Sequence, residues 1–289
     1  MGAEVEGLDE ETLAASALGP FLHGALLEHQ LLLLRGLHLE PESFRRLGRL
    51  LGPLRRVPRG MQIVPGLPEV QCLGNLGTDG RPTGRNPDPD SLQWHSDGSA
   101  TRIPARYTLL YGLRIPREGG ETIFADMYAA CAALSPAERR ALVGRRALHD
   151  PQVARWIRRG APIAASGGIL RRALMHIRFA ARLLASPTRH PVIRVHEETG
   201  RECLFVGDHA WRISGLPWRT GARRVEELNA FVTAHPEWTY THTWRAGDLL
   251  LWDNRCLLHR GSEYDVSHEA RVMLRAVVLG ERVPVAARI

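Results

Sequence analysis

Apolar residues along the chain gather in short runs that glycine, proline and polar residues separate. The runs Leu31–Leu37 and Leu249–Trp252 are continuous and strand-sized, which is typical of buried strands. Further strand-like segments are Tyr107–Leu113, Glu121–Phe124, Val192–His196, Cys203–Val206, Thr239–Trp244 and Arg271–Leu279. Many short strands between turn signals predict an all-β sandwich or barrel with added helices.

Helical spacing occurs near the N-terminus and again in the middle of the chain. Glu11–His29 is mostly helix-permissive, and Glu40–Leu54 carries apolar residues at Phe44, Leu47, Leu50 and Leu51 before Gly52-Pro53 ends the pattern. Residues 150–190 break the strand pattern with an amphipathic basic segment over 167–186. We interpret this segment as an inserted helix packed on the barrel, with a lid, a partner surface and a membrane-surface helix as the alternatives. Its expected apolar side is Ile169, Leu170, Leu174, Ile177 and Leu184.

Length and composition describe an ordinary soluble protein. The 289 residues, of which 44% are hydrophobic and 24% charged, fit one large domain or two small ones. No apolar run approaches the roughly 18–20 residues of a membrane span. The acidic start lacks the basic and apolar regions of a signal peptide, so we expect a cytoplasmic protein.

Every one of the 38 basic residues is arginine, and the chain contains no lysine. This excludes a Schiff-base lysine and a P-loop lysine, so any anionic ligand must be held by arginine, histidine or backbone N–H groups. The net charge of +7 comes without a long basic run or a cluster of stacking aromatics, and we expect no nucleic-acid partner. The four cysteines form no CxxC pair, which argues against a zinc ribbon or a disulfide framework.

The candidate chemistry begins with His95 and Asp97 in the segment WHSDGS. Residues two apart on a strand point to the same face, so this pair could bind one metal ion side by side. An HxD pair alone is weak support, but His259 follows an apolar strand in WDNRCLLHRG. Two histidines and one carboxylate form the facial triad of non-haem Fe(II) oxygenases, which leaves coordination positions open.

Two arginines follow the second histidine. On a strand, Arg271 and Arg275 share a face, so both guanidinium groups could point into one barrel. A buried arginine pair needs anionic partners, and the fork of a guanidinium suits carboxylates.

With these residues in place, the chain resembles the TauD/TfdA family of Fe(II)/2-oxoglutarate-dependent dioxygenases, from about Ala3 to Gly280. The resemblance is carried in order by WHSDGSATRIPARYTLLYGLRIPREGGETIFADMYAACAALS, HPVIRVHEETGRECLF, WRAGDLLLWDNRCLLHRG and RVMLRAVVLG. It is closer to the 2,4-dichlorophenoxyacetate branch in the segments NLGTDGRPTG, WHSDGSATRIPA and GDHAWRISGLP. The stretch RRVPRGMQIVPGLPEV lacks the histidine that the taurine branch has there, so we do not expect taurine as the substrate. The resemblance implies a mainly β, cupin-like double-stranded β-helix, or jelly roll, as a single domain over residues 1–289. A partly helical insertion around residues 150–190 would cover the pocket.

The resemblance also implies the ligand set. His95, Asp97 and His259 would bind Fe(II), and Thr122 of GGETIF would donate a hydrogen bond to the distal carboxylate of 2-oxoglutarate. Arg271 would pair with that carboxylate. Arg275 would lie near the substrate's anionic group or assist the cosubstrate. His209 would border the active site or be structural.

The implied activity uses Fe(II), 2-oxoglutarate and O2. Decarboxylation of 2-oxoglutarate to succinate and CO2 would be coupled to hydroxylation of an unactivated C–H bond in a small molecule that is anionic or derived from an amino acid, secondary-metabolite intermediates included. Desaturation, cyclisation or oxidative decarboxylation at the same iron site stay open, and a non-catalytic protein that binds metal and 2-oxoglutarate is the alternative from another class. We expect a small-molecule substrate and no membrane partner, and a homo-oligomer is left open.

Overall fold

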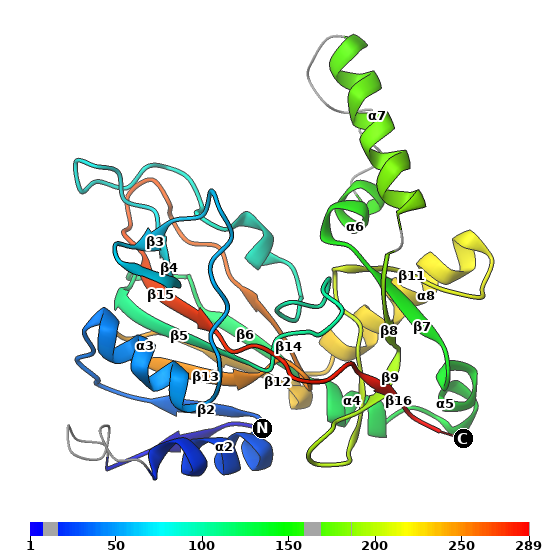
Figure 1. The fold of residues 1–289 in the computed structure, drawn as a ribbon, viewed down its shortest axis with the longest axis horizontal. Coiled ribbons are helices and arrows are strands. Elements are labelled where there is room, and N and C mark those ends of the chain that lie inside the picture. The colour runs from blue at the N-terminus through cyan, green and yellow to red at the C-terminus, as the bar shows by residue number, and fades with distance from the viewer. Residues whose placement is uncertain (8–16, 159–168, 186, 289) are drawn as a thin grey trace. The chain divides into compact units, whose positions relative to one another are not determined.

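The structure is a computed structural model that describes the chain except for residues 8–16, 159–168, 186 and 289 (Figure 1). The chain forms two compact units. Unit 1 comprises Met1–Asp97, Pro104–Asp126 and Pro236–Glu281, and unit 2 comprises Gly98–Ile103, Met127–His235 and Arg282–Ile289. The expected single dioxygenase domain over residues 1–289 stays a prediction.

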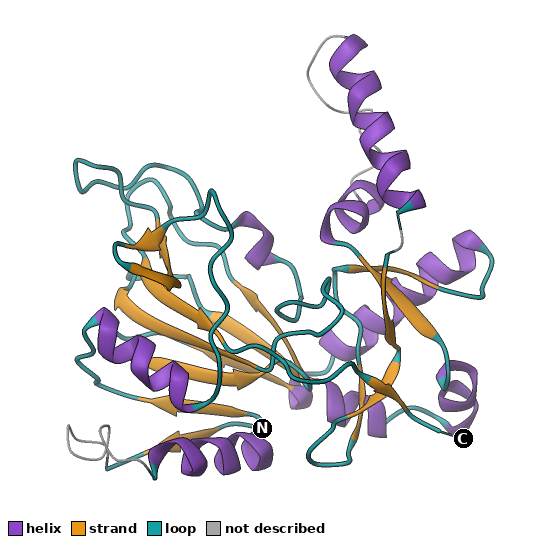
Figure 2. Cartoon of the chain, in the orientation of Figure 1, coloured by secondary structure: helices purple, strands orange, loops and turns teal. Residues whose placement is uncertain are grey.

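Unit 1 is built on a seven-stranded sheet in the order β1-β2-β13-β5-β15-β4-β3. Figure 2 draws the strands in orange and the helices in purple. Its strands are β1 (Ala3–Val5), β2 (Leu31–Leu34), β3 (Ile63–Val64), β4 (Leu67–Gly74), β5 (Tyr107–Arg114), β13 (Leu249–Asp253) and β15 (Val272–Val277). β1 pairs in parallel with β2, and the other neighbours are antiparallel. Four of these strands were predicted, whereas β4 has only two fully buried residues and carries no continuous apolar run.

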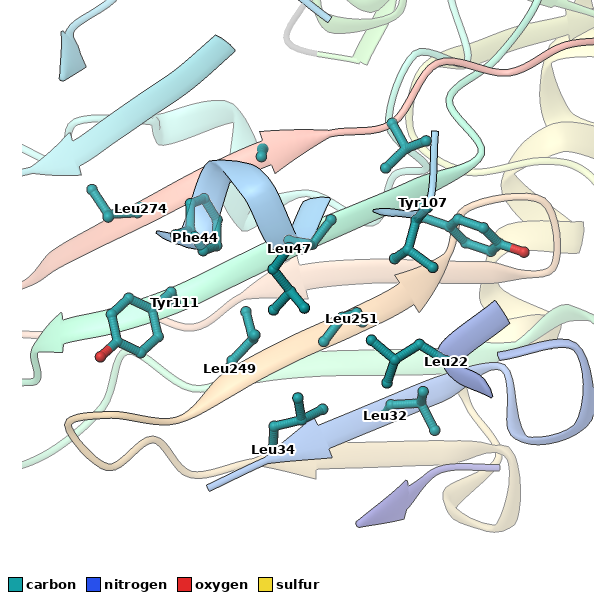
Figure 3. Close-up of a cluster of buried hydrophobic side chains, with 14 of the residues drawn as sticks. Leu22, Leu32, Leu34, Phe44, Leu47, Tyr107, Tyr111, Leu249, Leu251 and Leu274 are labelled. Carbon is teal, nitrogen blue, oxygen red and sulfur yellow. The ribbon is translucent and has the colours of Figure 1, made fainter. Parts of the chain in front are cut away.

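The continuous apolar runs of β2 and β13 are explained by burial on both faces of the sheet. Leu32 and Leu34 belong to a core cluster with Leu249 and Leu251 (Figure 3). The alternate residues of both strands, which point to the opposite face, are buried as well. The sheet therefore has one apolar face under helices and a second one turned inward.

Two helices contribute to this core cluster from outside the sheet: α2 (Leu18–His29) and α3 (Pro41–Leu50) (Figure 3). The part of the predicted Glu11–His29 helix at residues 11–16 lies outside the described residues. Proline suits the first turn of α3, because its missing N–H would be unpaired there anyway. Phe44 and Leu47 are buried as expected, but Leu50 is 43% exposed, because it falls beside the apolar stripe of the helix.

A second sheet of unit 1 has the order β12 (Thr239–His242), β6 (Thr122–Asp126), β14 (Leu257–Gly261), with antiparallel pairs. It faces the large sheet through Phe124 and Trp252, whose ring centroids lie 5.3 Å apart. Two facing sheets with helices packed outside form the predicted double-stranded β-helix. The 3₁₀ turns Pro89–Leu92 and Pro236–Trp238 complete this unit.

Unit 2 holds two small sheets and five described helices. The sheets are β11-β7-β8 and β10-β9-β16. Their strands are β7 (Arg146–His149), β8 (Thr188–Pro191), β9 (Ile193–Val195), β10 (Glu202–Leu204), β11 (Ala210–Ile213) and β16 (Val285–Ala286). The helices are α4 (Met127–Ala132), α5 (Pro136–Leu142), α6 (Pro151–Arg158), α7 (Ile169–Leu184) and α8 (Trp218–Thr233).

The predicted helix in the 150–190 region is present as α7, but its packing differs from the expected one. Phe179 and Leu183 pack against the buried cluster Leu148, Val153, Ala154 and Trp211. Leu174 and Ile177 are instead 49% and 65% exposed. Phe179 and Leu183, four residues apart, lie on the side of the helix that packs, whereas Leu174 and Ile177 lie on a side that is exposed. The side chains of Ile169, Leu170 and Leu184 lie outside the described part of the structure.

Among the residues that the structure describes, no helix has both the length and the apolar character needed to cross a bilayer.

Candidate metal centre

A single antiparallel bridge in unit 1 brings His95 and His259 directly opposite each other. The backbone N–H of His95 donates to the carbonyl of His259 (2.9 Å), and that of His259 donates to the carbonyl of His95 (2.8 Å). The two imidazole centroids lie 4.2 Å apart. His259 is the central residue of β14, whereas His95 belongs to no strand and Asp97 lies in a turn. The expectation that His95 and Asp97 share one strand is therefore wrong, because an isolated bridge takes the place of the strand.

Asp97 completes a buried cluster of three possible metal ligands. Its Oδ1 lies 3.9 Å from Nε2 of His95, and its Oδ2 lies 3.9 Å from Nε2 of His259. One ligand atom from each of the three residues falls within 4.8 Å of the others. Two imidazole nitrogens and one carboxylate are the donor set that non-haem Fe(II) takes, so the residues present fit that ion.

The tautomer of His95 suits metal binding. Its Nδ1 lies 2.7 Å from the carbonyl oxygen of Gln93, which can only accept a hydrogen bond, so Nδ1 carries the proton. This leaves the lone pair of Nε2 on the side of Asp97, available for a metal ion.

A hydrogen-bond network holds the Asp97 carboxylate in place. The Thr108 hydroxyl donates to Asp97 Oδ2 (2.6 Å), and Asn254 Nδ2 donates to the Thr108 hydroxyl (2.9 Å). The Asn254 side-chain oxygen in turn accepts from the Asp97 backbone N–H (3.1 Å) and from Trp252 Nε1 (3.1 Å). Sequence reasoning missed Thr108 and Asn254 and placed Trp252 only at the end of an apolar run. The polar Asn254 directly after the buried apolar strand was the signal in the sequence that could have indicated a supporting residue.

Arg275 lies beside the same carboxylate. Its guanidinium donates to Asp97 Oδ1 and also lies 3.8 Å from Asp88 Oδ2. Burial by itself would raise the pKa of the Asp97 carboxyl. The charges of Arg275, His259 and His95, together with the Thr108 hydrogen bond, outweigh burial and hold that pKa well below its usual range. The carboxylate is thus ionised, as a metal ligand must be.

Arg271 lies just before β15, at a site that suits an anion. Its backbone N–H donates to the Asn75 side-chain oxygen (2.9 Å). Its Nε is buried, has no hydrogen-bond partner within the described residues, and burial lowers the pKa of the guanidinium. Gly120 has a φ of +72°, and a Cβ there would lie 3.2 Å from Arg271 Nε, so a side chain at that position would crowd the guanidinium. The guanidinium lies over the Tyr264 ring (6.0 Å to the centroid), and among the described residues no carboxylate pairs with it. A largely buried cation without a counter-charge is costly, which fits a carboxylate ligand at this place.

Thr122 begins β6, two residues after Gly120, and is buried. Its Oγ1 accepts a hydrogen bond from Trp244 Nε1 (3.0 Å). Because an indole N–H can only donate, the hydroxyl proton of Thr122 stays available for another acceptor. Trp244 was missed by sequence reasoning, which placed it only at the end of a strand.

His209 belongs to unit 2, whereas the residues described above belong to unit 1. Its Nδ1 is 2.9 Å from the Ser99 hydroxyl, which belongs to the same unit. Its expected place at the border of the active site stays a prediction.

Comparisons with known proteins agree on one family. The model of the family described as "Taurine catabolism dioxygenase TauD, TfdA family" matches residues 1–277. An α-ketoglutarate-dependent 2,4-dichlorophenoxyacetate dioxygenase of Cupriavidus pinatubonensis is 32% identical over 292 residues, covering 97% of this chain and 95% of the relative. One of the same name from a Burkholderia strain is 38% identical over 189 residues, covering 65% of this chain and 58% of that relative.

The crystal structure of AAD-2 in complex with Mn(II) and N-oxalylglycine has a TM-score of 0.80 at 26% identity. The match covers 98% of this chain and 97% of AAD-2. This likeness confirms the predicted fold class.

Proposed function

The chain belongs to the TauD, TfdA family of dioxygenases, and from this premise we propose that it hydroxylates an unactivated C–H bond of a small molecule that is anionic or derived from an amino acid. It is a 2-oxoglutarate-dependent dioxygenase, an oxidoreductase that uses Fe(II), 2-oxoglutarate and O2. In the proposed reaction 2-oxoglutarate is converted to succinate and CO2, and the hydroxyl oxygen of the product comes from O2.

We assign the iron to His95, Asp97 and His259. The bound iron supplies the oxidising chemistry. The chain's own contribution is a fixed donor set, in which the Gln93 carbonyl sets the His95 tautomer and the Thr108 hydroxyl orients the Asp97 carboxylate. Such fixed orientation matters because ligand geometry depends on the groups around the ligands.

We assign the distal carboxylate of 2-oxoglutarate to Arg271 and Thr122. The guanidinium would neutralise the carboxylate, and the Thr122 hydroxyl, which accepts from Trp244, would donate its proton to it. The partnerless buried Nε of Arg271 supports this assignment.

The observation that carries the substrate class is the Arg275 guanidinium beside Asp97 at the metal cluster. When Asp97 serves as a metal ligand, the Arg275 guanidinium can pair with an anionic group of a substrate. The named relatives act on 2,4-dichlorophenoxyacetate, a molecule that carries a carboxylate. We therefore place the substrate's anionic group at Arg275, and we keep His209 as a candidate substrate contact.

Residues 1–289 are proposed to act as one dioxygenase domain, because the family match runs through both compact units. We propose a small molecule as the partner, and neither a nucleic acid nor a membrane. Many arginines are already paired with carboxylates, as Arg139 is with Glu202 and Arg158 with Asp208, so their charge is not available to bind an anionic polymer or surface.

An oxygen-labelling experiment tests this function. The protein would be supplied with Fe(II), 2-oxoglutarate and ¹⁸O2 and a set of aryloxyacetic and N-acyl amino acids, and succinate and product masses would be measured. Hydroxylation predicts that one ¹⁸O atom enters succinate and the other enters the product. An aryloxyacetate hydroxylated beside its ether oxygen should break down to a phenol and glyoxylate, so its label is sought in glyoxylate that is trapped before it exchanges with water. A product that has lost two hydrogens without gaining label would contradict hydroxylation, and the His259→Ala variant serves as the inactive control.

A further inference from the structure

Arg55, which sequence reasoning did not single out, lies beside the C-terminal end of β15. Leu54 forms an antiparallel bridge with Val278, and the backbone N–H of Arg55 donates to the Val277 carbonyl (2.8 Å). The segment at Leu54 and Arg55 therefore runs alongside the C-terminal end of the strand that carries Arg275.

The side chain of Arg55 is directed to the inward face of the large sheet. Leu54 is buried in the outer core cluster together with Leu274 and Val278. Neighbouring residues in extended backbone point to opposite faces, so Arg55 points to the face that bears Arg275. Burial lowers the pKa of Arg55, as expected for a side chain directed inward. The charge of Asp97 raises this pKa and the charge of Arg275 lowers it, which agrees with a position near both residues.

Arg55 has no partner of its own in the part of the chain that the structure describes: its guanidinium makes no hydrogen bond or ion pair there. Arg275 contacts Asp97 and Asp88, and Asp97 is the carboxylate assigned to the metal. With Asp97 assigned to the metal, Asp88 is one carboxylate beside two guanidinium groups, which leaves one positive charge in excess. A half-buried surplus of positive charge favours an anion.

We propose that Arg55 and Arg275 together bind the anionic group of the substrate, an oxyanion such as a carboxylate or a sulfonate. This inference rests on the proposed function and deepens it. Two guanidinium forks can hold the oxygens of one oxyanion from two sides, which favours anionic substrates strongly over neutral molecules of the same shape. Arg55 is then a residue that determines specificity, whereas Arg271 serves the cosubstrate.

The test is a binding measurement on the full chain, with Mn(II) in place of Fe(II) and with 2-oxoglutarate bound, so that no turnover occurs. The probes are phenoxyacetate, benzenesulfonate and the neutral phenoxyacetamide, titrated into the wild type, Arg55→Gln and Arg56→Gln. Arg56 is exposed and adjacent, so its variant removes the same charge from the same segment. We expect Arg55→Gln to weaken binding of at least one anionic probe about 10- to 100-fold, the effect of one charge-assisted hydrogen bond. Arg56→Gln should change it less than about twofold, as expected for a screened surface charge.

Phenoxyacetamide should bind the wild type and Arg55→Gln equally, and whichever anion loses more affinity identifies the preferred oxyanion. The proposal is overturned if neither anion distinguishes Arg55→Gln from the wild type, or if Arg56→Gln weakens binding as much. It is also overturned if Arg55→Gln loses affinity for 2-oxoglutarate instead. Thermal melting of the variant checks that it is folded. Failure of the proposed function would be seen separately, as wild-type protein that forms no succinate with Fe(II) and 2-oxoglutarate.

Discussion

His95 and His259 exchange both backbone hydrogen bonds of one isolated bridge, although 163 intervening positions separate them in the chain. His259 is at the same time held by β14, where it pairs with Phe124 of β6. The position of both imidazoles therefore depends on strand register, and a slip of one residue would turn His259 to the other face. The metal cluster is a consequence of how the second sheet is paired.

Replacing either histidine of this bridge tests the assigned ligands. His95→Ala and His259→Ala should abolish Fe(II)-dependent decarboxylation of 2-oxoglutarate, because two protein ligands remain where three are needed. Succinate release and iron content of the folded variants provide the measurement. His268→Ala, which changes an exposed histidine, is the control. Full activity in either bridge variant would refute the ligand set.

Arg271→Ala should weaken 2-oxoglutarate binding by about 3–5 kcal/mol, the loss expected when one partner of a buried ion pair is removed. The binding constant measured by calorimetry on the Mn(II)-loaded protein gives this value. Arg117→Ala removes an exposed guanidinium and should leave the affinity unchanged. An unchanged affinity in Arg271→Ala would move the cosubstrate role to Arg275.

Trp244→Phe should raise the dissociation constant of 2-oxoglutarate about 2- to 10-fold, because one hydrogen bond that orients the Thr122 hydroxyl is lost. The substrate affinity should stay the same, since the indole N–H donates to Thr122, which is assigned to the cosubstrate. Trp218→Phe, at a 44% exposed tryptophan, is the matched control. Equal affinity for 2-oxoglutarate in wild type and Trp244→Phe would show that the indole N–H has no positioning role.

Thr108 offers a pair of variants that separates the hydroxyl from the side-chain volume. Thr108→Val removes the donor to Asp97 and should weaken metal binding about 10- to 100-fold, whereas Thr108→Ser keeps the donor and should stay near the wild type. Competition with a metallochromic chelator measures the affinity. If both variants bind iron alike, the Thr108 hydroxyl does not support the carboxylate.

Two buried histidines of unit 2 make stability depend on pH. Burial lowers the pKa of His190 from 6.5 to about 4, and burial also lowers the pKa of His149 well below 6.5. Between pH 6.5 and 4 the unfolded chain binds protons that the folded chain does not, so the free energy of unfolding should fall as the pH falls through this window.

Urea unfolding at pH 7.5, 6 and 5 tests this pH dependence. The His190→Phe variant should show a smaller decrease in the free energy of unfolding between these pH values than the wild type. An equal decrease in both proteins would assign the effect to other groups. Asp97 should become protonated only below this pH range, because its pKa lies below the ordinary value of 3.8.

The sequence predicted the parts of the fold and site that depend on local pattern. The runs at Leu31 and Leu249 are strands because both of their faces are buried, and the helix at Phe44 follows its apolar spacing. The pairing of distant segments could not be read in this way: His95 was expected on a strand, and only the bridge to His259 shows how it is placed.

The supporting residues of the site escaped prediction for a similar reason. Asn254, Thr108 and Trp244 are ordinary polar or aromatic residues in sequence, and their roles arise from hydrogen bonds across the two sheets. Arg55 is one of many arginines in the sequence, and its position follows from the backbone bridge between Leu54 and Val278 at the end of β15.

The most direct test of the assigned iron and 2-oxoglutarate residues is an anaerobic titration of the metal-free protein with Fe(II) and 2-oxoglutarate. The assigned residues predict a visible charge-transfer band from iron to the keto acid, which should be absent in His259→Ala and should need much more 2-oxoglutarate in Arg271→Ala. A folded wild-type protein that develops no band, or a band of equal strength in His259→Ala, would contradict them.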